Sequence, residues 1–161
     1  MTIQVGDRIP DVPLTIATAD GPQATTSSDY FAGKKVALFA VPGAYTPTCS
    51  AKHVPGYVAN LDALKARGVD EIWCVSVNDA YVMAAWGRDQ DAIGKIRMLG
   101  DGSAELAKKL GLDRDLTKDG MGIRSRRFSL LVEDGVVKQV NVEQPGKFEV
   151  SNAETMLTQL A

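Results

Sequence analysis

The stretch Lys35-Val36-Ala37-Leu38-Phe39-Ala40-Val41-Pro42-Gly43-Ala44-Tyr45-Thr46-Pro47-Thr48-Cys49 runs from an apolar segment through a turn to a cysteine. Residues 36–41 form a continuous apolar run, which predicts a buried strand. Two prolines and a glycine shape the turn that follows. The sequence from Ser50 to Arg67 has helical character, so Cys49 is expected where a strand leads into a helix N-terminus.

Pro55 interrupts this helical segment, because its nitrogen has no hydrogen to donate to the preceding turn. We therefore predict a short first turn and then a longer helix, with Pro55 near its start and Gly68 at its end. Val58, Leu61 and Leu64 recur at helical spacing and mark the buried face.

The remaining elements alternate in type along the chain. Strands are predicted at 71–77, 95–99, 128–133 and 136–142, and helices from a cap at Asp79 to about Gln90, over 104–110, and from a capping box at Ser151–Glu154 to Leu160. Asp134-Gly135 is a hairpin turn signal, and the polar residues 20–29 are predicted to form a loop. This order favours an α/β fold whose central mixed sheet has helices on both faces.

Length and composition set the broad class of protein. The 161 residues (17.2 kDa) predict a single domain over 1–161. A net charge of -2 gives no reason to expect nucleic acid or a membrane as partner. The first seven residues lack the features of a secretory signal. Two cysteines, Cys49 and Cys74, fit a reducing compartment, so we predict a cytoplasmic location.

Cys49 is the strongest candidate for chemistry. The thiolate is the nucleophilic form of cysteine, and the partial positive charge of helix N–H groups favours it. The Thr46 hydroxyl precedes the sulfur by three residues, and the backbone amides of Thr48 and Cys49 are expected to face a bound oxygen, as at other anion sites of this kind. The competing interpretation is a buried, inert cysteine.

These residues also carry a resemblance to a known family. Pro42, Thr46 and Cys49 form the Pro-x-x-x-Thr-x-x-Cys pattern of peroxiredoxins. The fuller string Val41–Ser50, followed by His53-Val-Pro-Gly-Tyr57, resembles the type II branch, also called the peroxiredoxin-five subfamily. Further matches follow in order at Val75–Asp79, Trp86–Arg88, Arg124–Ser129 and Val142-Glu143. The resemblance implies a thioredoxin-like fold with an N-terminal hairpin extension, and a thiol peroxidase that needs no cofactor or metal.

The resemblance also assigns roles to particular residues. Cys49 is expected to be the peroxidatic nucleophile, Pro42 to shield it and Thr46 to hydrogen-bond the peroxide. Arg127 directly precedes the strand at 128–133 and matches the active-site arginine of type II members. Its guanidinium would favour the thiolate and support developing negative charge. From the residues alone, Arg124-Ser-Arg-Arg127 also fits a solvated basic turn, and Arg124 and Arg126 are expected at the surface or an interface.

His53 and Cys74 are expected to be structural. His53 lies on the same helical face as Cys49, which suggests a Cys–His pair, but a capping or packing role is favoured. Cys74 lies in a predicted strand, 25 residues after Cys49, and is interpreted as a packed core thiol. That spacing occurs in plant-like type II members, so Cys74 remains a weak candidate for a resolving cysteine. Residues 146–151, where some animal members carry theirs, contain no cysteine.

The predicted activity is reduction of hydrogen peroxide and alkyl hydroperoxides through a Cys49 sulfenic acid. With no clear resolving cysteine, the expected reductant is glutathione, with or without glutaredoxin, and thioredoxin is the second choice. The family suggests a homodimer, with Tyr45 and Trp86 as candidates for apolar contact area, although the core is the commoner place for such residues. The alternative is a non-enzymatic peroxide sensor, or a redox-regulated binding protein, that uses the same thiol. No Cys-x-x-Cys and no zinc-ligand set is present in the sequence.

Overall fold

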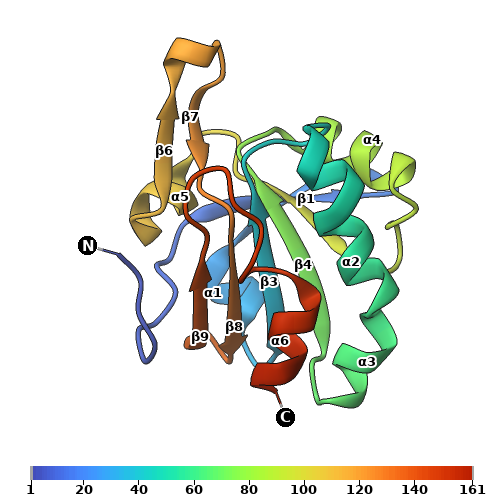
Figure 1. Cartoon of the computed structure of the whole chain (residues 1–161). Helices are drawn as coiled ribbons and strands as arrows, with labels where there is room; N and C mark the ends of the chain where they lie inside the picture. Colours follow the sequence, from blue (N-terminus) through green and yellow to red (C-terminus); the bar gives the residue numbers. More distant parts are fainter. Residues whose placement is uncertain (1, 161) are drawn as a thin grey trace.

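A computed structural model describes residues 2–160, which form a central mixed sheet with helices on both faces (Figure 1). The sheet has seven strands in the order β2-β1-β5-β4-β3-β8-β9. Their bounds are β1 Pro13–Thr18, β2 Gly21–Thr26, β3 Lys35–Val41, β4 Glu71–Ser76, β5 Arg97–Gly100, β8 Phe128–Glu133 and β9 Val136–Val142. β3 pairs in parallel with β4 and antiparallel with β8. The predicted α/β class and mixed sheet are confirmed.

Helices cover both faces, and a small hairpin stands apart from the sheet. The helices are α1 Ser27–Phe31, α2 Val54–Ala59, α3 Leu61–Ala66, α4 Ala80–Asp89, α5 Glu105–Leu110 and α6 Ala153–Gln159, with a π-helix at Cys49–His53 and a 3₁₀ turn at Thr117–Asp119. β6 Asp113–Leu116 and β7 Gly122–Ser125 pair only with each other within the described residues. In Figure 1 this hairpin projects beyond the end of the sheet.

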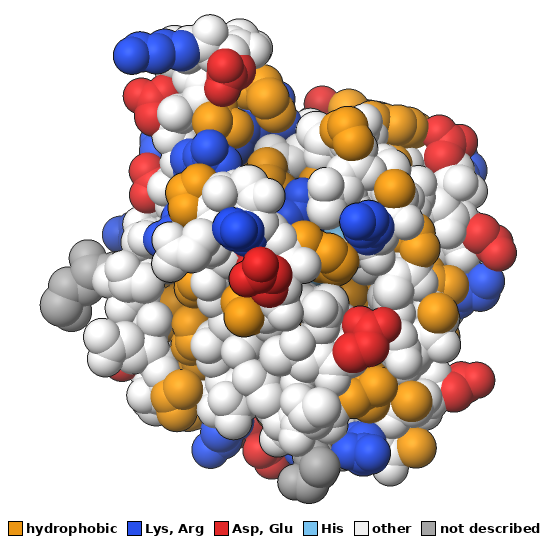
Figure 2. Space-filling model, in the orientation of Figure 1, with side chains coloured by type: hydrophobic (Ala, Val, Ile, Leu, Met, Phe, Trp, Pro, Cys, Tyr) orange, Lys and Arg blue, Asp and Glu red, His pale blue; other side chains and the backbone are white. Residues whose placement is uncertain are grey.

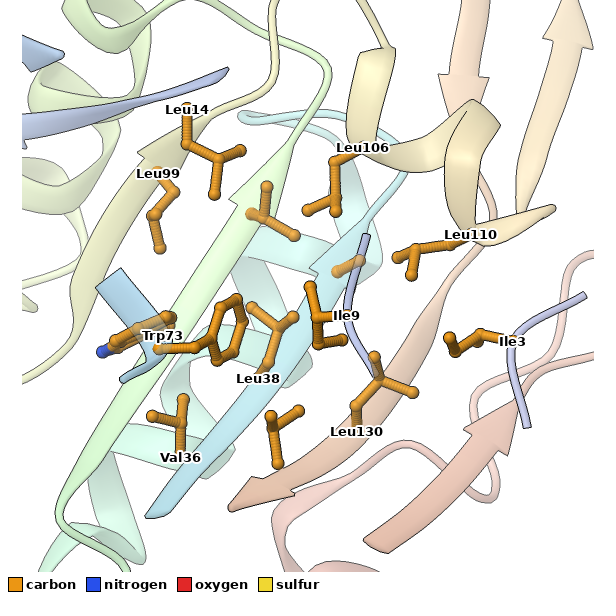
Figure 3. Close-up of a cluster of buried hydrophobic side chains, with 14 of the residues drawn as sticks. Ile3, Ile9, Leu14, Val36, Leu38, Trp73, Leu99, Leu106, Leu110 and Leu130 are labelled. Carbon is orange, nitrogen blue, oxygen red and sulfur yellow. The ribbon is translucent and has the colours of Figure 1, made fainter. Parts of the chain in front are cut away.

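The strand β3 is apolar on both sides because both faces of the sheet are buried. Val36, Leu38 and Ala40 point into one core, which also contains Trp73 and Leu106 (Figure 3). Ala37, Phe39 and Val41 point into the other core, beneath α2, α3, α4 and α6. Cys49 and Cys74 both belong to this second core. Because Val41, at the end of β3, and Cys49 both belong to the second core, the turn between them lies on that face of the sheet.

The N-terminal hairpin extension is present, but the loop predicted at 20–29 is wrong. β1 and β2 form an antiparallel hairpin, and β1 also pairs with β5. β2 is the edge strand of the sheet and most of its residues are exposed or half-buried. An exposed edge strand needs no apolar pattern and tolerates Pro22, so its polar sequence resembled a loop. Residues 27–29 open α1, which Thr26 caps through the N–H of Asp29.

The segment after Cys49 is more broken than predicted. Its first turn is a π-helix, in which the N–H of Val54 donates to the carbonyl of Cys49. Pro55 then lies in the first turn of α2, where its missing N–H is not needed. The expected longer helix divides at Asn60 into α2 and α3. The short first turn is therefore confirmed, and a single continuous helix after Pro55 is wrong.

Candidate active site

The turn that presents Cys49 is fixed by hydrogen bonds from β4 and its following residues. Asn78 accepts through Oδ1 from the N–H of Ala44 (3.0 Å) and from the Ser76 hydroxyl (2.6 Å). Gly100, at the end of β5, packs so tightly that a Cβ there would lie 2.9 Å from the carbonyl oxygen of Asn78. Tyr45 takes a left-handed conformation (φ 66°), which is uncommon for a residue other than glycine. The turn is therefore held in a specific shape by its neighbours.

The Cys49 sulfur is buried and has two polar partners. The Arg127 guanidinium donates through Nη2 to Sγ at 3.0 Å. The Thr46 hydroxyl oxygen lies 2.7 Å from Sγ and 2.7 Å from the carbonyl oxygen of Gly43. A hydroxyl has one hydrogen, so Thr46 donates to a thiolate, or donates to Gly43 while accepting from a neutral thiol. Both arrangements keep its oxygen beside the sulfur.

The second arm of the Arg127 guanidinium is held by His53. Arg127 Nη1 lies 2.8 Å from His53 Nδ1, and His53 Nε2 lies 3.0 Å from the carbonyl oxygen of Ser151. Arg127 has no acceptor and a carbonyl has no donor, so Nε2 carries the proton and Nδ1 accepts. The imidazole is thus neutral, and it fixes the plane of the guanidinium.

Burial explains why His53 stays neutral. The ring is fully buried, and desolvation, followed by the nearby Arg127 charge, lowers the pKa of His53 from 6.5 to about 3. Phe39 and Phe148 pack against it, with ring centroids 4.7 and 4.9 Å away. A neutral acceptor beside Arg127 orients the guanidinium without competing with the sulfur for its charge.

The carbonyl that anchors His53 is itself fixed by a buried carboxylate. Glu143, just after β9, accepts from the backbone N–H groups of residues 149, 150 and 151 and from the Ser151 hydroxyl, at 2.7–3.0 Å. Burial opposes ionisation, but these donors leave the pKa of Glu143 below its usual value. Because Ser151 gives its hydroxyl to Glu143, Asn152 caps α6 instead. The capping box predicted to start at Ser151 is therefore wrong.

The other residues singled out in the sequence lie in different settings. Cys74 is fully buried in β4, opposite Phe39 in the parallel register, and it forms no disulfide. Desolvation, followed by the nearby Cys49, raises the pKa of its thiol well above the usual value. Arg124 donates to the carbonyl of Met121 at 2.8 Å and lies 3.5 Å from that of Pro42. Trp86 is buried and donates to the Ser50 hydroxyl, whereas Tyr45 is 51% exposed.

A pocket of about 120 Å³ adjoins this group of residues. Pro42, Thr48 and Arg127 line it, together with Arg114, Arg126 and the residues at 143–147. Over residues 2–160, no cluster of three or more His, Cys, Asp or Glu side chains is arranged to hold a metal ion. None of the described helices is long and apolar enough to cross a membrane.

Comparison with known proteins identifies the family. The family model described as Redoxin matches residues 4–157. Peroxiredoxin-2B of Arabidopsis thaliana is 48% identical over 98% of this chain and 98% of its own length. The chain belongs to the peroxiredoxins. It resembles the type II, or peroxiredoxin-five-like, members and is therefore a thiol-dependent peroxidase, as the resemblance implied.

Solved structures agree with this peroxiredoxin fold. The reduced Prx3 of Vibrio vulnificus in complex with hydrogen peroxide is 51% identical, with a TM-score of 0.95 over 99% of this chain and 100% of that one. A Burkholderia cenocepacia protein described as a putative thioredoxin reductase is 54% identical, with a TM-score of 0.98 over 100% of this chain and 99% of that one. The thioredoxin-like peroxiredoxin fold, with its central mixed sheet, is thereby confirmed.

The sequence assigned no role in the site to Asn78 or Glu143, and for His53 it favoured capping or packing over a pair with Cys49. Asn78 positions the turn, Glu143 fixes the 149–151 segment, and His53 holds Arg127. The spacing of His53 from Cys49 did place the two on one helical face. Its hydrogen bond to Arg127, 74 residues away, joins the π-helix to the residue before β8 and has no local sequence signal.

Proposed function

We propose that Cys49 is the peroxidatic nucleophile of this peroxiredoxin. The observation that carries the proposal is the pair of polar groups on one sulfur: Arg127 Nη2 at 3.0 Å and the Thr46 hydroxyl oxygen at 2.7 Å. A guanidinium and a hydroxyl at hydrogen-bond distance are the groups that an attacking sulfur anion needs around it. The Cys49 thiolate attacks one oxygen of a hydroperoxide, the O–O bond breaks, and the other oxygen leaves as alkoxide or hydroxide and takes a proton. Cys49 is left as a sulfenic acid.

The surrounding groups stabilise the charge that moves to the leaving oxygen. Arg127 supplies a guanidinium held in a fixed plane, and Thr46 a hydroxyl that can turn to the peroxide. The first helical hydrogen bond runs from the N–H of Ser50 to Thr46. The amides of Thr48 and Cys49 therefore belong to the first turn, where N–H groups lack partners within the helix and can face the peroxide oxygens. Pro42 lines the approach and shields the sulfur.

Regeneration is proposed to use an external thiol. Cys74 is fully buried in a central strand of the sheet, which supports its assignment as a core residue over that of a resolving cysteine. A one-cysteine cycle needs a first thiol to form a mixed disulfide with Cys49, releasing water, and a second thiol to release the thiolate. Glutathione, with or without glutaredoxin, is the proposed source of both thiols, and thioredoxin is the second choice.

Steady-state reduction of hydrogen peroxide and of an alkyl hydroperoxide tests the proposal. Glutathione alone, glutathione with glutaredoxin, and thioredoxin should be compared with wild-type protein and with Cys74→Ala. We expect sustained turnover with glutathione, increased by glutaredoxin, and little change in Cys74→Ala. Turnover with thioredoxin alone that disappears in Cys74→Ala would instead assign Cys74 as the resolving cysteine.

A homodimer and a cytoplasmic location complete the proposal. Tyr45, an aromatic side chain of the turn before Cys49, is 51% exposed and offers apolar area for a second copy. The two free thiols fit a reducing compartment. Sedimentation of the wild type and of a Tyr45→Glu variant measures the oligomeric state. We expect a dimer for the wild type and a shift toward monomer for the variant.

A further inference from the structure

The pocket beside the active site is strongly basic. Arg114 comes from β6, Arg126 and Arg127 precede β8, and Lys147 comes from the segment after β9. Figure 2 shows basic side chains between the projecting hairpin and the main body of the molecule. The only acidic side chain in the lining is that of Glu143, and its oxygens accept hydrogen bonds from the 149–151 segment. The lining therefore carries an excess of positive charge.

Two of these cations have no acidic partner in the structure. Among the described residues, no carboxylate oxygen lies within 4.0 Å of the Arg114 or Arg126 guanidinium. Both side chains are half-buried, and Arg126 donates to the backbone carbonyl of Glu143 at 3.0 Å. Lys147 lies 3.9 Å from Glu149. Half-buried like charges gathered without a counterion repel one another, and an anion bound between them relieves that repulsion.

The position of the pocket links it to the sulfur. Arg127 lines the pocket and also donates to Cys49 Sγ, and Pro42 and Thr48 line the same pocket. A volume of about 120 Å³ fits a carboxylate on a short arm but not a folded partner. A ligand anchored there by its carboxylate keeps the rest of its length free to reach Cys49.

We propose that Arg114, Arg126 and Lys147 bind a carboxylate of the small thiol that reduces Cys49, and that they select a tripeptide-sized acidic thiol over neutral ones. This inference rests on the proposed reduction by glutathione, which carries two carboxylates. The thiol sulfur attacks the sulfenic acid, an S–S bond forms, the S–OH bond breaks, and water leaves. A second thiol then attacks the mixed disulfide, releasing the oxidised disulfide and the Cys49 thiolate.

The test compares Arg114→Gln and Lys147→Gln with Lys118→Gln, a matched charge removal on the same hairpin but outside the pocket. The second-order rate of sulfenic acid reduction is measured with glutathione and with its diethyl ester, which lacks the carboxylates. We expect Arg114→Gln and Lys147→Gln each to lower the rate of sulfenic acid reduction by glutathione about tenfold. The rate with the ester should be unchanged. Lys118→Gln should leave both rates unchanged, and none of the three should alter oxidation by hydrogen peroxide.

Several outcomes would overturn the proposal. One is that the pocket variants lose as much rate with the ester as with glutathione. Another is that Lys118→Gln loses as much rate with glutathione as they do. The third is that the pocket variants keep the wild-type rate with glutathione. The pocket variants could instead show a slower oxidation of Cys49 by a carboxylated hydroperoxide only, with unchanged rates for cumene hydroperoxide and for glutathione. That result would assign the pocket to the peroxide instead of the thiol.

Binding of the unreactive S-methylglutathione, measured by calorimetry, separates this inference from the proposed function. If the wild type binds it and Arg114→Gln does not, the pocket assignment holds even where glutathione fails as reductant. If glutathione drives turnover but S-methylglutathione binds the wild type and Arg114→Gln equally, the pocket assignment fails and the reductant stands.

Discussion

Cys49 and Cys74 share a hydrophobic core and are both fully buried, yet their surroundings are chemically opposite. Cys49 begins a π-helix, and its sulfur contacts the Arg127 guanidinium and the Thr46 hydroxyl. Cys74 lies within a strand, where burial raises the pKa of its thiol. Burial alone therefore does not distinguish the proposed nucleophile from a cysteine of the core. The charged and polar groups that the fold brings to the sulfur make the difference.

The largest expected difference is between removing one thiol and removing the other. Cys49→Ser should lower peroxidase turnover roughly 10³-fold or more, since the serine hydroxyl is a poor nucleophile for peroxide oxygen. Cys74→Ala should keep turnover within about twofold and lose stability of the order of 1 kcal/mol from the small cavity it leaves. Turnover assays and urea unfolding of both variants measure this, and a Cys49→Ser protein with full activity would contradict the proposal.

The second comparison removes the positive charge beside Cys49 and leaves Cys49 itself unchanged. Arg127→Met should slow sulfenic acid formation about 10²- to 10³-fold, because the thiolate and the leaving oxygen both lose their cation. Arg127→Lys should recover only part of the rate, since a single ammonium cannot contact both the sulfur and His53. Stopped-flow reaction with hydrogen peroxide gives the rates. Equal rates in Arg127→Met and the wild type would exclude a role for the guanidinium.

The pH dependence of stability tests whether His53 is buried as a neutral imidazole. The folded protein keeps His53 neutral down to about pH 3, whereas the unfolded chain takes up a proton below its ordinary pKa of 6.5. The unfolded state therefore binds more protons as pH falls, and this residue alone removes about 2 kcal/mol of stability between pH 7 and pH 5, a factor of about 30.

Urea unfolding of the wild type and of His53→Gln at pH 7 and pH 5 isolates this contribution. From pH 7 to pH 5, the unfolding free energy of His53→Gln should fall by about 2 kcal/mol less than that of the wild type. Parallel pH slopes in the two proteins would show that His53 does not carry it.

The smallest expected effect comes from loosening Arg127 without changing its charge. His53→Leu removes the acceptor for Nη1 and should slow sulfenic acid formation roughly tenfold. His53→Gln offers an amide oxygen in its place and should restore part of the rate. A purely packing role for His53 predicts that leucine is tolerated at least as well as glutamine, so the order of the two variants decides.

The sequence predicted those elements whose residues carry a local signal. β3 was evident because both of its faces are buried, and the hairpin of β8 and β9 because Asp134-Gly135 marks its turn. No strand was predicted at β1, β2, β6 or β7. The residues of β2, β6 and β7 are mostly exposed or half-buried, so these strands have no apolar alternation to detect.

The same limit applies to the site. Cys49 and Thr46 lie within one turn of each other, so their proximity could be predicted from the spacing. Arg127 is 78 residues from Cys49, and only the resemblance to type II peroxiredoxins placed it at the sulfur. The contact of His53 with Arg127, and of Glu143 with the 149–151 segment, arises only when strands and loops distant in sequence pack together. Arg126 was expected at the surface or an interface and instead lines the pocket beside the site.

Gly100 has a consequence for anyone screening the chain for inactive variants. It carries no functional group and does not touch the reactive sulfur, but a methyl group there would collide with the main chain at Asn78 and Ala80. Gly100→Ala would displace the Asn78 amide and release the loop that it ties at Ala44. A random screen should therefore recover this position as a loss-of-function site, although Cys49 and Arg127 are unchanged.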